Sequence, residues 1–252
     1  MIKVNNLISG YGKKIVLKNI NISFEKGLIY GLIGPNGCWK TTFLRALSGI
    51  TKIINGDVLI DEKSIRSINF RDIAKIIAVV LPEERLIFDF KVSDIVYMGK
   101  TPYLKWNRFY DDNDSLDEIL KETDLFLKRN DYYNELSSGE RQLVEIARGL
   151  AQEPEYLLLD EPTTHLDLMN QIKIMSLMKK LNKEKNITII SVMHDINLAS
   201  LYCDKLVIMK GGCIFKEGKT NDILDKINIK DVFYVDVDII EKAGKRQIIL
   251  ET

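Results

Sequence analysis

The feature that most constrains the fold is a short apolar run that breaks at a glycine and resumes as a helical pattern. The run covers residues 28–33, and the loop after it is Gly34-Pro35-Asn36-Gly37-Cys38-Trp39-Lys40-Thr41-Thr42. Apolar residues then recur at helical spacing in Phe43, Leu44, Ala46 and Leu47. A strand, a loop and a helix start in this order are the context that a phosphate-binding loop requires. The stretch therefore predicts a nucleotide ligand.

Two residues of this loop supply the chemistry that a bound nucleotide needs. Backbone N–H groups of such a loop surround an anion, and the next helix directs the positive end of its dipole to the same place. Lys40 adds a positive charge at the outer phosphates, and Thr41 offers its hydroxyl to Mg²⁺. We therefore expect residues 34–42 to bind the phosphates.

Trp39 departs from the usual pattern G-x-x-x-x-G-K-[ST], which has a glycine at this position. Glycine lets the backbone adopt an unusual conformation close to the phosphates, whereas tryptophan adds a Cβ atom and a large indole to a crowded turn. Two outcomes follow. Either Trp39 weakens nucleotide binding, or the N–H groups still surround the phosphates with the indole turned outward.

Length and composition limit the class of protein. The 252 residues suit one domain with a small subdomain, and 46% hydrophobic with 29% charged residues is typical of a globular chain. The 36 basic residues balance the 36 acidic ones, which argues against a nucleic-acid partner. Three scattered cysteines suit a reducing cytosol. We expect neither a signal peptide nor a membrane span of ~20 apolar residues, so work at a membrane would require a partner.

Acidic residues and a histidine follow three predicted buried strands. Residues 76–80 lead to Glu83, residues 156–159 to Asp160 and Glu161, and residues 187–192 to His194. Because the carboxyl ends of parallel strands share one edge of the sheet, these side chains should lie beside the phosphate loop. Asp160 would hold Mg²⁺ and Glu161 would face an attacking water, since two consecutive buried acids need a cation or a proton. The alternatives are a solvated turn acid for Glu83 and a satisfied polar residue for His194.

Residues 92–151 have the pattern of an inserted helical subdomain. Helical spacing recurs on both sides of Pro102, which ends the first predicted helix. Four aromatic residues after this proline would form a docking surface or simply pack the subdomain: Tyr103, Trp106, Phe109 and Tyr110. The last helix begins at Leu136-Ser137-Ser138-Gly139-Glu140, where the Ser-Ser-Gly turn would bind an anion or where Ser137 or Ser138 would cap the helix.

Antiparallel strands are predicted at both ends of the chain. Residues 2–8 and 15–24 alternate in polarity, and Tyr11 in the turn between them would stack on an adenine ring or stay an ordinary surface residue. Near the C-terminus, Val232, Phe233, Val235, Val237 and Ile239 alternate in the same way. The single domain, 1–252, is thus divided into a core with a β subdomain (1–91 and 152–225), a helical subdomain (92–151) and a small C-terminal β extension (226–252).

Together these segments closely resemble the ATPases of ATP-binding cassette (ABC) transporters over nearly the whole chain. The resemblance rests on Gly34–Thr42 as Walker A, Leu136–Glu140 as the LSGGQ signature in the form LSSGE, Leu157–Glu161 as Walker B, Leu166-Asp167 as the D-loop, Tyr11 as the adenine-stacking aromatic and His194 as the switch histidine. Glu83 stands where the family has the glutamine of its Q-loop. The order and spacing of these motifs identify the chain as a member of this family.

The resemblance implies an α/β fold and a reaction. The expected fold is a P-loop NTPase core, a mixed sheet with flanking helices, together with an antiparallel β subdomain and an inserted α-helical subdomain. The implied ligands are ATP and Mg²⁺. The residues implied to bind the metal are Thr41, Glu83 and Asp160. Glu161 would polarise water for in-line attack on the γ-phosphate, helped by His194 and Lys40. The phosphates would bind to Gly34, Pro35, Asn36, Gly37, Cys38, Trp39, Lys40, Thr41 and Thr42.

The resemblance also implies partners. Two copies would enclose two ATP molecules head to tail, and Ser137, Ser138, Gly139 and Glu140 of each copy would contact the nucleotide of the other. Residues 94–103 and 194–204 and the C-terminal tail are similar to the ATPases that serve iron-siderophore, haem and cobalamin importers. This implies an ATP-hydrolysing homodimer at the cytoplasmic face of the membrane, bound to permease subunits and indirectly served by an extracellular substrate-binding protein.

Two other interpretations compete with an importer ATPase. Trp39 favours a non-catalytic or weakly active nucleotide-dependent interaction subunit, which would predict that Trp39→Gly restores hydrolysis. A soluble cassette acting on nucleic acid or ribosomes is the third interpretation. The single cassette, the balanced charge and the absence of a long coiled-coil insertion argue against it, so no nucleic-acid partner is expected.

Overall fold

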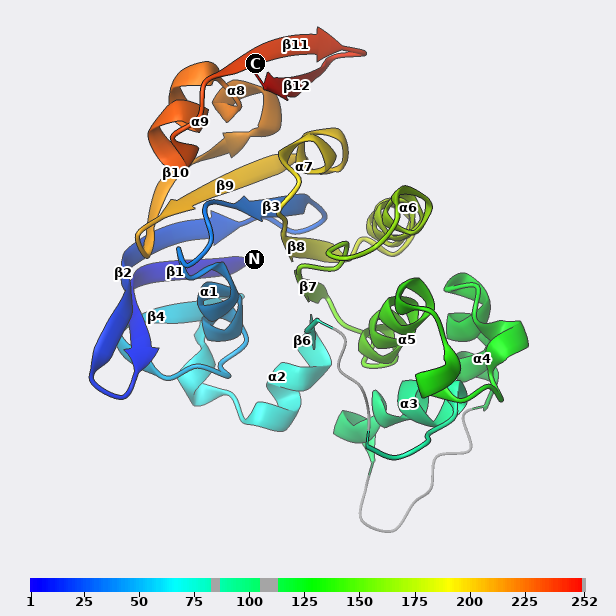
Figure 1. The fold of residues 1–252 in the computed structure, drawn as a ribbon. Coiled ribbons are helices and arrows are strands. Elements are labelled where there is room, and N and C mark those ends of the chain that lie inside the picture. The colour runs from blue at the N-terminus through cyan, green and yellow to red at the C-terminus, as the bar shows by residue number, and fades with distance from the viewer. Residues whose placement is uncertain (83–86, 105–112, 251–252) are drawn as a thin grey trace.

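The largest sheet has six strands in the order β10-β9-β3-β8-β7-β6. The computed structural model describes residues 1–82, 87–104 and 113–250 (Figure 1). Five strands of the sheet run parallel, and β10 pairs with β9 in antiparallel fashion. The strands are β3 (Ile29–Ile33), β6 (Ile77–Val80), β7 (Tyr156–Asp160), β8 (Thr188–Val192), β9 (Lys205–Lys210) and β10 (Cys213–Lys219). This mixed sheet and its flanking helices confirm the predicted fold class.

A second, antiparallel sheet has the strand order β2-β1-β4-β5. Its strands are β1 (Ile2–Tyr11), β2 (Lys14–Phe24), β4 (Ile53–Ile60) and β5 (Lys63–Ser64), and a short helix, η1 (Ile65–Ser67), follows. The hairpin between β1 and β2 is tighter than the sequence predicts, because Tyr11 is the last residue of β1 and pairs with Lys14. Tyr11 therefore has a strand partner rather than a place in a loose turn.

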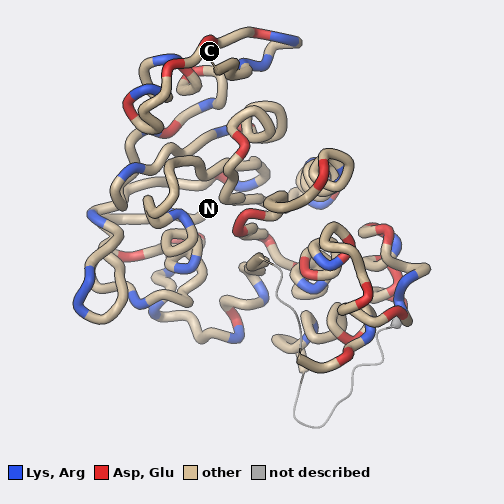
Figure 2. The backbone as a smooth tube through the Cα atoms, in the orientation of Figure 1, with Lys and Arg blue, Asp and Glu red and all other residues tan. Residues whose placement is uncertain are grey.

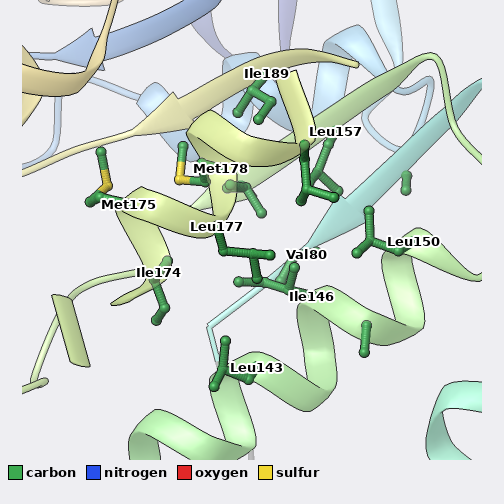
Figure 3. Packing of buried hydrophobic residues seen from close by; sticks show 14 of the residues in the cluster. Val80, Leu143, Ile146, Leu150, Leu157, Ile174, Met175, Leu177, Met178 and Ile189 are labelled. Atoms are coloured by element: carbon green, nitrogen blue, oxygen red, sulfur yellow. The ribbon is translucent and has the colours of Figure 1, made fainter. Parts of the chain in front are cut away.

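Residues of the six-stranded sheet alternate between two hydrophobic cores, as the two-residue period of a strand requires. On β7, Leu157 and Leu159 face one core, whereas Tyr156 and Leu158 face the other. The first core packs against α5 (Ser138–Leu150) and α6 (Leu168–Lys185), whose apolar side chains meet those of the strands in Figure 3. The second core packs against α1 (Lys40–Leu47) and the antiparallel sheet.

A helical region precedes α5 in the chain and lies beside the core in Figure 1. It contains α3 (Val92–Met98), η2 (Thr101–Tyr103), α4 (Asn113–Glu122), η3 (Phe126–Lys128) and η4 (Tyr133–Glu135), and α2 (Phe70–Ile76) faces it from the core. Of the four aromatic residues noted after Pro102, Tyr103 donates a hydrogen bond to the Gln152 carbonyl at 2.8 Å. Trp106, Phe109 and Tyr110 lie outside the described residues.

The C-terminal extension, residues 226–252, begins with a helix where the sequence predicts a strand. It contains α9 (Lys226–Phe233), β11 (Val237–Lys242) and β12 (Lys245–Leu250), and α7 (Ile196–Tyr202) and α8 (Thr220–Ile223) precede it in the chain. The strand predicted across Val232 and Phe233 is wrong at these residues, because with Ile229 they also have helical spacing, and Asp225 caps the helix by accepting from the Asn228 N–H. The two-stranded sheet starts at Val237.

Charges of both signs are interspersed along the chain (Figure 2), as the equal numbers of acidic and basic residues lead one to expect. Among the helices in the described ranges, none combines the length and the apolar character that crossing a bilayer demands.

Candidate functional site

The phosphate loop connects β3 to α1 at the carboxyl edge of the six-stranded sheet. Gly34 begins the loop with φ +152°, and a Cβ atom there would lie 2.3 Å from the Met209 carbonyl oxygen and 2.8 Å from Cys38 Sγ. Any side chain at this position would collide with β9. The first glycine of the motif is therefore fixed by close packing against the neighbouring strand.

Lys40 carries its charge inside the loop. Its side chain is 5% exposed, and its ammonium donates to the carbonyl oxygens of Gly34 at 2.8 Å and of Pro35 at 3.3 Å. Burial raises the pKa of the neighbouring Cys38 thiol despite the Lys40 charge 3.9 Å away, so Cys38 stays a thiol at neutral pH. The loop thus combines a helix N-terminus with one buried cation, an arrangement that suits an anionic phosphate.

Trp39 adopts the left-handed conformation that glycine would provide. Its φ is 77° and its ψ is 29°, and its carbonyl accepts from the Phe43 N–H at 3.0 Å, so α1 starts normally. The half-buried indole packs against the second core, and Lys14 Nζ lies 5.2 Å from the centre of a ring of this side chain. The indole therefore lies between the loop and the β1–β2 hairpin.

Trp39→Gly is expected to be more stable than Trp39→Ala by ~1–2 kcal/mol, because the folded chain holds residue 39 in the left-handed conformation and this conformation costs a non-glycine residue that amount. Trp39→Ala is the matched control, since alanine removes the indole but keeps the Cβ atom and the backbone cost. Chemical denaturation would compare the free energies of unfolding of the wild type and both variants. Equal stability of the two variants would contradict the backbone cost and assign the effect of residue 39 to its indole alone.

Thr41 and Asp160 bring a hydroxyl and a carboxylate together below the loop. Thr41 Oγ1 donates to Asp160 Oδ1 at 3.0 Å, and Asp160 is only 2% exposed at the end of β7. Burial raises the pKa of Asp160, with a further contribution from the neighbouring Glu161 charge. A buried carboxylate with a hydroxyl beside it fits Mg²⁺, which prefers oxygen ligands and would compensate the buried charge.

Glu161 and His194 meet at the same edge of the sheet. His194 Nε2 lies 2.6 Å from Glu161 Oε1, and the two side chains are 39% and 28% exposed. Glu161 has φ 54° and donates its backbone N–H to the Val192 carbonyl at 3.2 Å, which fixes its place relative to β8. The acid and the histidine predicted from two strand ends thus form one pair that solvent can reach. Glu83, the third predicted strand-end acid, lies outside the described residues.

Tyr11 lies next to the phosphate loop. Its hydroxyl forms a hydrogen bond of 3.2 Å with Thr42 Oγ1, which lowers the pKa of Tyr11. The side chain is 47% exposed and borders a groove of about 700 Å³ that Arg45 and Thr51 also line. An exposed aromatic ring beside the loop is suitably placed to stack on a base, and this role stays a prediction.

Ser137 and Glu140 form a capping box at the start of α5. The Ser137 hydroxyl accepts from the Glu140 N–H at 3.4 Å, and Glu140 Oε2 accepts from the Ser137 N–H at 2.9 Å and from its hydroxyl at 2.8 Å. Burial disfavours the charge of Glu140, but the Lys128 ammonium and the Ser137 donors outweigh it and lower the pKa to about 2. Of the two candidate caps, Ser137 is the one that caps the helix.

The signature residues 137–140 are separate from the group around Lys40 in the same chain. A Cβ atom at Gly139 would lie 2.5 Å from the side chain of Asn170 on α6, so this glycine permits close packing of the two helices. Figure 1 shows α5 and α1 in different parts of the molecule. An anion bound to the start of α5 would therefore be distinct from one bound by Lys40 of the same copy.

The contacts that three residues make in the site were not predicted from sequence. Lys14 lies over the ring of Trp39, Thr164 Oγ1 donates to Glu161 Oε2 at 3.4 Å, and Gln171 Nε2 donates to the carbonyls of Thr163 at 3.3 Å and Leu166 at 3.1 Å. The last bond holds the loop after Walker B against α6. No local pattern marks these residues, because each is an ordinary polar residue until the fold brings its partner near.

This arrangement identifies the class of protein. A loop with a buried lysine, a hydroxyl–carboxylate pair and a strand-end glutamate at one edge of a parallel sheet are the parts of a P-loop ATPase. A family model described as ABC transporter matches residues 17–164, and the chain belongs to this family. It is an ATP-binding subunit of the ATPase type, in which ATP hydrolysis is coupled to transport, as the resemblance of its motifs predicts.

The alignments with related proteins cover almost the whole chain. The petrobactin import ATP-binding protein FpuC of Bacillus anthracis is 35% identical over 97% of this chain and 91% of its own length. The iron(3+)-hydroxamate import ATP-binding protein FhuC of Bacillus subtilis is 37% identical over 92% of this chain and 87% of its own length. These relatives do not support the interpretation of a non-catalytic subunit.

Solved structures agree with this family. A chain of an ABC transporter assigned to the metal-chelate type, in an inward-facing conformation, superposes with a TM-score of 0.84 at 28% identity and covers 98% of this chain and 95% of that one. A bacterial ABC transporter cassette solved as a dimer superposes with a TM-score of 0.75 at 31% identity, covering 87% of this chain and 99% of that one.

Proposed function

We propose that the chain is the ATPase subunit of an importer for metal chelates, such as an iron-siderophore, haem or a cobalamin-like compound. The observation that carries the proposal is the convergence of Lys40, Thr41, Asp160 and Glu161 at one sheet edge in a chain whose relatives FpuC and FhuC are ATP-binding proteins for the import of petrobactin and of iron(3+)-hydroxamate. The overall fold is also similar to that of a chain from a metal-chelate type ABC transporter.

The residues of the site divide the work of hydrolysis. The loop and Lys40 would bind the phosphates, while Thr41 and Asp160 would hold Mg²⁺, which neutralises charge on the phosphates when bound. Glu161 would accept a hydrogen bond from the attacking water, because its carboxylate lies at the solvent-accessible end of β7. His194 Nε2 lies 2.6 Å from this carboxylate, within hydrogen-bond distance, and would orient it. Tyr11 would stack on the adenine, since its exposed ring lies beside the phosphate loop.

Two copies would complete each site. The start of α5, with Ser137 at its cap, would bind an anion, and it lies away from Lys40 of its own copy. Head-to-tail pairing would bring residues 137–140 of one copy to the nucleotide of the other, and a related cassette has been solved as a dimer. The Glu140 carboxylate is occupied by Ser137 and Lys128, so its negative charge is partly compensated before a phosphate arrives.

The permease would bind in an apolar groove between α2 and the helical region. The groove has a volume of about 830 Å³ and is lined by Phe70, Arg71, Met98, Pro102, Leu104 and Gln152 among others. Phe70 and Met98 are 64% and 43% exposed, and Arg71 holds the far wall by donating to the carbonyls of Pro102 and Leu104. Exposed large apolar side chains around a concave surface mark a protein interaction site. Binding of the permease in this groove would hold the chain at the cytoplasmic face of the membrane, with a substrate-binding protein acting on the other side.

Phe70→Asp is expected to lower the recovery of the permease with the chain by at least about tenfold, because aromatic anchors dominate such interfaces. Mg-ATP binding by the isolated chain should not change, since Phe70 is not in contact with the phosphate loop. Ile227→Asp is the matched control, because Ile227 is 73% exposed on α9, outside the groove. Co-purification from membranes would measure both variants. Equal loss of the permease in both would contradict a specific role of the groove.

Transport by the purified membrane complex would test the proposed function itself. The complex would be reconstituted in liposomes with radiolabelled ferric siderophore, haem and cobalamin on the side of the binding protein. We expect uptake of one of these chelates that depends on Mg-ATP on the side of this chain. Uptake of a sugar or amino acid instead, with no chelate transported, would contradict the proposed substrate class but leave the ATPase intact.

A further inference from the structure

The helix that follows His194 holds the last strand of the chain through its polar side chains. Asn197 Nδ2 donates to the Ile248 carbonyl at 3.0 Å, and the Ile248 N–H donates to Asn197 Oδ1 at 2.7 Å. Ser200 on the next turn of α7 donates its hydroxyl to the Arg246 carbonyl. The amide of Asn197 therefore satisfies both backbone groups of one residue of β12, as a neighbouring strand would. Figure 1 shows the β11–β12 hairpin next to α7.

The first turn of α7 is fixed from both sides. Asp195 caps the helix by accepting from the Leu198 N–H at 2.9 Å. Ile196 packs against the first core and also against the small C-terminal core formed by Leu224, Ile229 and Val237. Ile196 thus lies between the first core and the C-terminal core, against which Ile239 and Ile248 of the hairpin also pack. Loss of the hairpin contact would leave the first core to hold the start of α7.

His194 depends on this anchorage for its position. Its side chain is 39% exposed, so surrounding side chains enclose it only in part. Its backbone is held on one side by β8, where the Met193 N–H donates to the Leu32 carbonyl at 3.0 Å, and on the other side by α7. A contact of 2.6 Å between His194 Nε2 and Glu161 Oε1 requires both sides to stay in place.

We propose that Asn197 is a positioning residue for ATP hydrolysis, which ties α7 to β12 and thereby holds His194 against Glu161. The C-terminal hairpin is then part of the machinery of the site, although neither strand reaches the phosphate loop. This inference rests on the proposed role of Glu161 and His194. A loosened α7 would let the imidazole move, and misplacement by ~1 Å from a distant substitution costs up to 10²-fold in rate.

The same hairpin offers a matched control. Asn221 on α8 also makes two hydrogen bonds with it: its Nδ2 donates to the Gly244 carbonyl at 2.7 Å, and its Oδ1 accepts from the Arg246 N–H at 3.4 Å. Asn221→Ala would therefore loosen the hairpin without removing an anchor from α7. Asn197→Asp is a second variant, because it retains the acceptor for the Ile248 N–H while it replaces the donor with a charged oxygen.

Steady-state hydrolysis of Mg-ATP by the full chain would test the proposal. Asn197→Ala should lower kcat by about five- to tenfold, with KM for ATP within about twofold of wild type, since the phosphate loop is untouched. Asn197→Asp should lie between Asn197→Ala and wild type, and Asn221→Ala should stay within about twofold of wild type. In a His194→Ala background, Asn197→Ala should have little further effect, because a residue acting through His194 has nothing left to position.

Hydrogen exchange of the same proteins gives a readout without catalysis. The backbone amide hydrogens of residues 194–198 should exchange faster in Asn197→Ala than in the wild type. In Asn221→Ala they should exchange at the wild-type rate. Equal kcat in Asn197→Ala and wild type, equal losses in both alanine variants, or a loss that adds fully to that of His194→Ala would each overturn the proposal. A wild-type chain that hydrolyses no ATP would instead contradict the proposed function of the whole site.

Discussion

Glu161→Gln is expected to lower the rate of Mg-ATP hydrolysis by about 100-fold or more, the usual contribution of a positioned general base. Glutamine has the shape of glutamate and can still accept a hydrogen bond from His194, so the site should remain assembled. The change removes a negative charge that contributes to the raised pKa of Asp160, so Mg-ATP should bind as tightly as before or more tightly. Phosphate release and equilibrium binding would be measured on the same preparation.

The control for this substitution is Glu118→Gln, which makes the same chemical change at an exposed glutamate on α4. It should hydrolyse ATP at the wild-type rate. Unchanged turnover in Glu161→Gln would remove Glu161 from its assigned role. Lost nucleotide binding in that variant would mean that the carboxylate holds the site together rather than acting on water.

Lys40→Ala should weaken Mg-ATP binding by at least about 100-fold, equivalent to about 2.8 kcal/mol. The lysine is the buried cation of the loop, and hydrogen bonds between charged groups are roughly twice as strong as neutral ones. Removing it leaves the Gly34 carbonyl without a donor that it has in the wild-type loop, so a modest loss of stability should accompany the loss of binding. Titration calorimetry and thermal unfolding would separate the two effects.

Lys63→Ala serves as the control, because Lys63 is an exposed lysine on β5 in the antiparallel sheet. It should bind Mg-ATP as the wild type does. If Lys40→Ala bound Mg-ATP with wild-type affinity, the loop would owe its affinity to backbone N–H groups and the helix dipole alone, and the phosphate role of Lys40 would be withdrawn.

The sequence predicts much of the site because parallel strands place their carboxyl ends together. Asp160, Glu161 and His194 each follow a buried apolar run, and the order β3-β8-β7 brings these ends to one edge beside Lys40. The resemblance to the family predicts the roles of these residues, whereas the strand pattern alone predicts that they lie close together. The predicted fold class was confirmed for the same reason, since continuous apolar runs indicate strands buried on both faces.

The rest depends on how distant segments dock, and no local pattern records that. The strand predicted at Val232 is a helix because its apolar residues fit both periods, and packing against the small C-terminal core decided between them. The bond of Asn197 to Ile248 joins residues 51 positions apart. The position of the Trp39 indole follows from the tip of the β1–β2 hairpin, which brings Lys14 over it.

The alternation of β7 between two cores has a consequence for the chemistry at its end. A slip of one residue in the pairing of this strand would exchange Leu157 and Leu159 with Tyr156 and Leu158, and so place the wrong shapes in both cores at once. Hydrocarbon packing on two faces therefore sets the pairing register that brings Asp160 to Thr41 and turns Glu161 toward His194. The positions of the polar reacting groups are therefore determined by the packing of the most apolar part of the molecule.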